Sequence, residues 1–117
     1  INCAINPFTL IYNCHNGEVP TRAGPWLDTC LTELQELLRA QGVTEELAPL
    51  VHDVIRSTAA NSSSMRQDLH AGRRTEIDYI LGYACRQARQ NGLQVPALER
   101  LLDAAKDCLR RHQLPTD

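Results

Sequence analysis

Residues 61–82, NSSSMRQDLHAGRRTEIDYILG, contain two helix starts, and the apolar-periodic segments of the chain lie on either side of them. Serine and asparagine side chains accept hydrogen bonds from the free N–H groups of a first helical turn, so a helix is predicted to begin near Ser63 or Ser64. Ser64 and Gln67 have the spacing of a reciprocal cap. The unpaired amides and the helix dipole at such a start favour an anion, for example a substrate carboxylate.

A second helix is predicted to begin after Gly72. Thr75 and Asp78 again have capping spacing, and Glu76 falls in the first turn of this helix. Two starts in one short stretch could bring a hydroxyl, an amide and a carboxylate into a common site. Capping pairs are common, however, so two well-capped helices joined by a solvated turn are the alternative.

The apolar residues in the rest of the chain recur with helical periodicity. No segment alternates apolar and polar residues with period two, so an all-α fold is expected. Prolines near first turns and glycines after last turns indicate where these helices begin and end. We expect helices over residues 1–13, 25–41 and 44–60, the last capped by Thr44, a helix that stops at Asn91 and Gly92, and a final helix from Pro96. Residues 15–24 are expected to form a connector with turns, and Glu33 and Glu36 to lie on a solvated helix face.

The first helix has an unusual composition. Asn2 and Asn6 lie one turn apart on the same face, and Pro7 removes a backbone donor, so a kink is predicted there. Asparagine is a weak helix former, and departures from local preference concentrate at functional sites. The spacing alone also fits two polar residues on a helix surface.

Length and composition restrict the function classes. A chain of 117 residues is long enough for one modest core but not for a cofactor domain together with a substrate domain. The net charge of −2 gives no case for nucleic acid or an anionic membrane as partner, and no apolar run could span a bilayer. Because the chain begins at Ile1 within a helix-like segment, we expect it to be a piece of a longer protein.

The five cysteines form no C-x-x-C pair and are expected to be reduced thiols of a cytoplasmic protein. Cys14 beside His15 is a poor zinc motif, so no metal is expected. Eleven of the twelve basic residues are arginine, and Lys106 lies near the C-terminus, so a catalytic lysine is not expected in this chain. No G-x-G-x-x-G loop occurs that could bind a dinucleotide.

The string SSMRQDLHAGRRTEIDYILGY, from Ser63 to Tyr83, resembles the C-terminal domain of ketopantoate reductase (2-dehydropantoate 2-reductase). Asn2, Asn6 and Pro7 match the opening Lys-x-x-x-Asn-x-x-x-Asn-Pro of that domain without its Lys, which would precede Asn2 by four positions. The resemblance implies a compact multi-helix fold of the 6-phosphogluconate dehydrogenase C-terminal-like type. It also implies that residues 1–117 form the substrate-binding helical domain, paired with an N-terminal Rossmann domain absent from this chain.

The same resemblance implies an NADPH-dependent reduction of ketopantoate to pantoate, for pantothenate and coenzyme A synthesis, with this domain inactive on its own. Carried over by position, Glu76 is the catalytic acidic residue that orients the substrate and the lysine. Asn2, Asn6, Asn61 and Ser64 are the substrate contacts. A homodimer is left open.

Other residues and functions remain as alternatives to these. Asp68 is expected to be structural, accepting from the backbone, from Arg73 or from Arg74, while the two arginines could instead reach a cofactor phosphate. The alternative functions are a related reductase of another 2-oxo acid and a non-catalytic helical interaction module.

Overall fold

The computed structural model describes all 117 residues, and they form helices and no strand, which confirms the all-α prediction. None of the helices is both long and apolar enough to cross a bilayer. In chain order the elements are α1 (Asn2–Tyr12), the 3₁₀ turn η1 (Asn16–Glu18), α2 (Val19–Ala23), α3 (Pro25–Ala40), α4 (Leu47–Ser57), α5 (Ser64–Ala71), the π-helix η2 (Asp78–Gly82), α6 (Tyr83–Gln90) and α7 (Pro96–Arg111).

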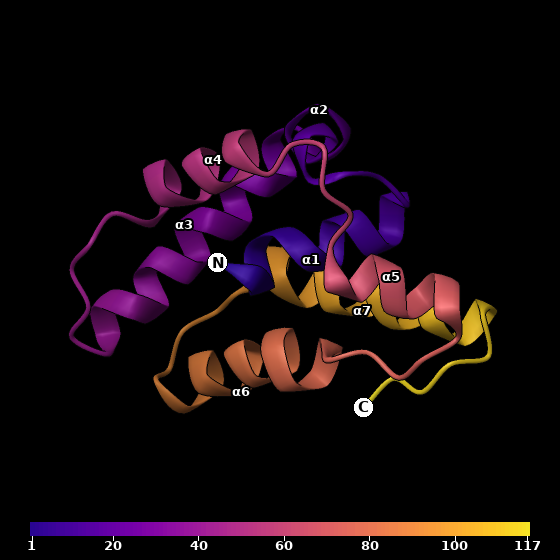
Figure 1. Cartoon of the computed structure of the whole chain (residues 1–117). Helices are drawn as coiled ribbons and strands as arrows, with labels where there is room; N and C mark the ends of the chain where they lie inside the picture. Colours follow the sequence, from indigo (N-terminus) through magenta and orange to yellow (C-terminus); the bar gives the residue numbers. More distant parts are fainter.

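Helix α1 is the central element of the domain. Every residue from Ala4 to Leu10 is buried, as expected for a helix that is covered on all sides. It packs against α7, α5, α2 and η2, and Figure 1 shows α3 and α4 on one side of it and α6 on the other. Pro7 lies inside α1, which continues to Tyr12, and the kink at Pro7 stays a prediction.

Helices α3 and α7 begin at the predicted prolines, Pro25 and Pro96. The solvated position expected for Glu33 is wrong, because its side chain is buried and its two oxygens accept from Ala97 N at 3.0 Å and Leu98 N at 2.8 Å. Those amides belong to the first turn of α7, whose free N–H groups and dipole favour a carboxylate. Glu33 therefore joins the middle of α3 to the start of α7.

The predicted start of α4 at Thr44 is also wrong. The helix begins at Leu47, and its N-cap residue makes no side-chain capping bond. Gln35 of α3 supplies the cap instead, because its Oε1 accepts from Leu47 N at 2.7 Å and its Nε2 donates to Glu45 O at 2.9 Å. A partner from another helix has replaced the local one.

The connector is more ordered than expected, because residues 16–23 form η1 and α2. Its backbone touches the segment before α5: Asn16 N donates to Asn61 O at 3.1 Å and Gly17 N to Ala59 O at 3.0 Å. A Cβ on Gly17 would lie 2.7 Å from Ala59 Cβ and 3.0 Å from Ala59 Cα. Glycine is therefore required at position 17 by close approach rather than by its own backbone angles.

We expect Gly17→Ala to lower the free energy of unfolding by about 1–3 kcal/mol, the usual cost of overpacking. The obstructing atoms include backbone, which cannot swing aside as a side-chain tip could. Urea unfolding monitored by circular dichroism measures the effect. Combining the change with Ala59→Gly removes the nearest clash and should restore part of the loss; full additivity of the two changes would contradict the contact.

All five cysteines are unpaired, and four of them are buried. Burial raises the pKa of the Cys30 thiol to about 12 and that of Cys85 to about 11. Desolvation disfavours the thiolate, which is the reactive form. These two side chains therefore act as small apolar core residues at neutral pH.

Candidate functional site

The first predicted helix start lies against α1. Helix α5 begins at Ser64, and Ser63 is its N-cap, with Ser63 Oγ accepting from Arg66 N at 3.0 Å. The predicted reciprocal cap between Ser64 and Gln67 is wrong, since Gln67 Nε2 donates to Ser62 O instead. Because the cap lies one residue earlier, the Ser64 hydroxyl is not used in capping.

A buried bond joins this start to α1. Thr9 Oγ1 lies 2.6 Å from Ser63 Oγ and 2.8 Å from Asn6 O, and Thr9 and Ser63 are both buried. The beginning of α5 thus lies beside the middle of α1, as Figure 1 shows. The main chain of Asn6 therefore lies next to the start of α5, whose first residue is Ser64, and Asn61 lies just before that start.

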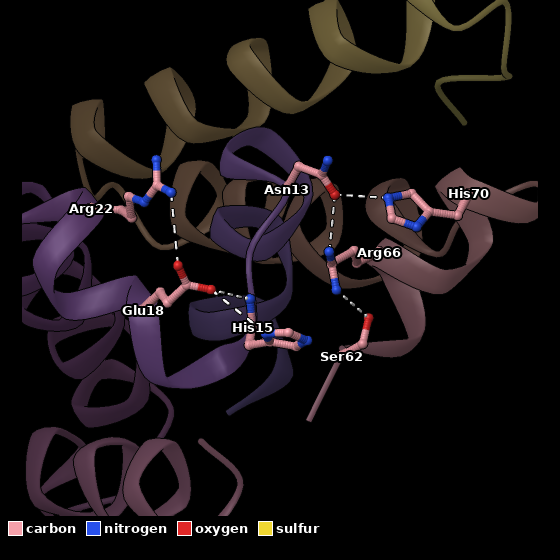
Figure 2. A network of polar contacts seen from close by, with 7 residues as sticks. All are labelled: Asn13, His15, Glu18, Arg22, Ser62, Arg66 and His70. Atoms are coloured by element: carbon pink, nitrogen blue, oxygen red, sulfur yellow. Dashed lines mark hydrogen bonds and ion pairs between the residues drawn. The ribbon is translucent and has the colours of Figure 1, made fainter. Parts of the chain in front are cut away.

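A polar network holds α5 to the end of α1 (Figure 2). Asn13, in the left-handed conformation at φ 50°, places its Oδ1 2.9 Å from Arg66 Nε and 2.7 Å from His70 Nε2. Arg66 NH1 also donates to Ser62 Oγ at 3.1 Å. The Arg66 guanidinium therefore fixes the residues just before α5 relative to α1.

The second helix start follows Thr75, whose Oγ1 accepts from Ile77 N at 3.3 Å. The predicted partnership of Thr75 with Asp78 is wrong, because Asp78 Oδ1 accepts from Arg86 NH1 at 3.0 Å. The helix then passes through the π-helix η2, which packs against α1. No pattern in the sequence predicted the π-helix η2. Short π-helical segments occur frequently at functional sites.

The five predicted site residues share one property: no side chain among them makes a hydrogen bond or ion pair within the chain. Asn6 is only 7% exposed. Its amide nevertheless reaches solvent, because every fully buried side-chain nitrogen or oxygen except Asn16 Oδ1 has a hydrogen-bond partner, whereas the Asn6 amide has none. The other four, Asn2, Asn61, Ser64 and Glu76, are exposed.

Four surface hollows of the domain can be compared with these residues. None of four surface hollows, with volumes between about 200 and 550 Å³, is lined by any of them. The structure places Asn6 and Ser64 in the turns that the Thr9–Ser63 bond joins, Asn61 two residues before Ser63, Glu76 immediately before η2, and Asn2 at the exposed start of α1. No three Cys, His, Asp or Glu side chains are grouped as metal ligands.

Asp68 pairs with Arg73, as expected, because its Oδ1 accepts from Arg73 Nε at 3.0 Å. Arg74 pairs with Asp117 near the C-terminus. Sequence reasoning missed Thr9, the residue that joins the two parts of the site. The available signal was a lone hydroxyl inside the apolar run of the first helix.

Comparison with known proteins identifies the family. Residues 1–108 match the family model described as ketopantoate reductase PanE/ApbA, C-terminal. The chain belongs to this family. Among curated relatives of this ketopantoate reductase domain, the 2-dehydropantoate 2-reductase of Yersinia pestis is 44% identical over 91% of the chain. That of Vibrio cholerae is 40% identical over 91%. The chain spans 36% and 37% of these two relatives, just over a third of their length.

Solved structures agree with this assignment of the ketopantoate reductase domain. A probable 2-dehydropantoate 2-reductase from Bacillus subtilis superposes with a TM-score of 0.80 at 32% identity, covering 92% of this chain and 37% of that one. A PanE/ApbA family ketopantoate reductase from Ralstonia eutropha JMP134 gives 0.82 at 27% identity, covering 96% and 39%. The resemblance stated from the sequence is confirmed, both in family and in fold.

Proposed function

We propose that this domain is the substrate-binding part of an NADPH-dependent 2-dehydropantoate 2-reductase, which reduces ketopantoate to pantoate in the cytoplasmic synthesis of pantothenate. An N-terminal Rossmann domain would bind the cofactor, because this chain has no glycine-rich phosphate loop. A cleft between the two domains would hold the substrate, which fits an open surface rather than an enclosed pocket here.

Ketone reduction requires a proton as well as a hydride. NADPH would supply the hydride, and because negative charge develops on the ketone oxygen, a proton donor is needed to neutralise it. By the family resemblance, that donor would be a lysine four positions before Asn2. Glu76 would orient this lysine and the substrate, as an exposed carboxylate without a partner in the chain is free to do.

Neutral amides and hydroxyls would hold the rest of the substrate. Ketopantoate carries a carboxylate and a hydroxyl, for which the Asn6 amide, the Ser64 hydroxyl and the first-turn amides of α5 offer donors. Asn2 and Asn61 would complete this set. The observation that carries the proposal is that Asn6 lies in an almost fully buried turn of α1, yet its amide makes no bond within the chain and still reaches the surface, where a ligand can bind it.

Steady-state kinetics of the full-length protein test the proposal. We expect NADPH oxidation with ketopantoate and a kcat/KM at least roughly tenfold above that for other 2-oxo acids, since a site built to bind a hydroxyl rejects analogues without it. The isolated chain of 117 residues serves as the control and should show no turnover. Preference for another 2-oxo acid would favour the related reductase, and absence of any turnover would favour the interaction module.

A further inference from the structure

We infer that Thr9 and Ser63 are positioning residues, which set the separation of Asn6 and Ser64 through a directional chain of hydrogen bonds buried between α1 and α5. The inference rests on the proposed function, because it assigns these two hydroxyls to the precision of that site. Neither residue is itself offered as a substrate contact.

The direction of the chain follows from counting protons. Each hydroxyl has one proton to donate. Asn6 O can only accept, so Thr9 Oγ1 donates to it across 2.8 Å. The proton of the 2.6 Å contact between Thr9 and Ser63 must then come from Ser63 Oγ. Ser63 Oγ in turn accepts from Arg66 N at 3.0 Å. The sequence of donors is Arg66 N–H, Ser63 O–H, Thr9 O–H, ending on Asn6 O.

Burial makes this chain rigid. Thr9 is fully buried and Ser63 is 7% exposed, so water cannot substitute for a broken link. Hydrogen bonds in series polarise one another, and in a low-dielectric interior a broken link leaves its neighbour unsatisfied. The links begin in the first turn of the helix that opens with Ser64 and end on the main chain of Asn6. A change in either hydroxyl therefore moves one predicted contact relative to the other.

A purely local role does not account for Thr9. Threonine in a helix often donates to a carbonyl in the preceding turn, and Thr32 of α3 does so with Asp28 O at 3.1 Å. Thr32 is exposed and has no partner on another helix, whereas Thr9 is bonded to Ser63, 54 residues away in sequence. This difference makes Thr32 the matched control.

The test measures kinetics of Thr9→Val in the full-length protein. Valine keeps the shape and removes the hydroxyl. We expect kcat/KM for ketopantoate to fall roughly tenfold, because small misplacements of binding groups are costly, while the KM for NADPH stays within twofold. Thr9→Ser, which keeps the hydroxyl, should recover most of the loss, and Thr32→Val should stay within twofold of the wild type.

Two further measurements keep the inference falsifiable. Ser63→Gly removes the same link with little loss of capping, and should reproduce the kinetic effect if Thr9→Val folds poorly. Hydrogen exchange at the Arg66 amide should accelerate in Thr9→Val, whatever the substrate. Wild-type kcat/KM in both variants, or equal losses in Thr9→Ser and Thr9→Val, would overturn the inference. If the wild type itself does not reduce ketopantoate, the proposed function fails. The hydrogen-bond chain is tested separately, because unchanged exchange at the Arg66 amide in Thr9→Val would overturn it whatever the substrate.

Discussion

Glu76→Gln in the full-length protein is expected to lower kcat/KM for ketopantoate by about 10²–10³-fold, the range found when a charged group acts on the reacting centre. Glutamine keeps the size of the side chain and removes the negative charge that would orient the lysine. Because Glu76 is exposed and has no partner in the chain, the free energy of unfolding should change by no more than about 0.5 kcal/mol. Steady-state kinetics and thermal unfolding of one preparation measure both quantities.

Glu46→Gln is the matched control for this prediction. Glu46 is also exposed and makes no ion pair, but it lies just before α4 rather than beside η2. It should leave both kcat/KM and stability unchanged. A melting temperature that falls in parallel with activity in Glu76→Gln would support the alternative of two capped helices with a solvated turn. An unchanged kcat/KM would remove Glu76 from the catalytic group.

Local sequence signals predicted several of the helix starts, although not the reciprocal caps at Gln67 and Asp78. Pro25 and Pro96 begin α3 and α7, and Ser63 and Thr75 accept from amides of the turns that they precede. A cap of this kind involves residues two or three apart, so it can be inferred from spacing. The apolar stripes of the long helices can also be recognised from the sequence alone.

Remote partners account for two of the errors, the start of α4 and the position of Glu33. Helix α4 begins at Leu47 because Gln35 on another helix binds its first amide, and Thr44 makes no cap. Glu33 has the spacing of a solvated residue but is buried, because the start of α7 lies over it. Neither contact can be derived without knowing which helices pack together. Such tertiary contacts override local preference.

The members of the candidate site were proposed from the sequence, but the contact that joins two of them was not. Asn6, Ser64 and Glu76 came from a family resemblance over a long string, which the comparison with known proteins supports. Asn6 and Ser64 are linked through Thr9, which contacts Ser63 only because α1 and α5 cross at that point, whereas Glu76 lies apart from them before η2. Whether these side chains bind substrate stays a prediction.

Glu33→Ala should give the largest loss of stability among the substitutions considered, about 3 kcal/mol in the free energy of unfolding. The carboxylate accepts two charge-assisted bonds from Ala97 N and Leu98 N, and its removal leaves both amides unpaired at the start of α7. Trp26 Nε1 also donates to Ala97 O at 3.1 Å, so the contact between α3 and α7 would loosen on both sides of that residue. Urea unfolding of the domain measures the change.

The neighbouring Glu36 separates this effect from a general loss of charge on α3. It lies on the same helix but is exposed, so Glu36→Ala should change stability by no more than about 0.5 kcal/mol. Glu33→Gln keeps one acceptor oxygen and should lose roughly half as much as Glu33→Ala, since one of two amides remains paired. Equal losses for Glu33→Ala and Glu36→Ala would mean that water replaces the carboxylate at the start of α7. In that case α3 and α7 would be held together by apolar packing and the Trp26 bond alone.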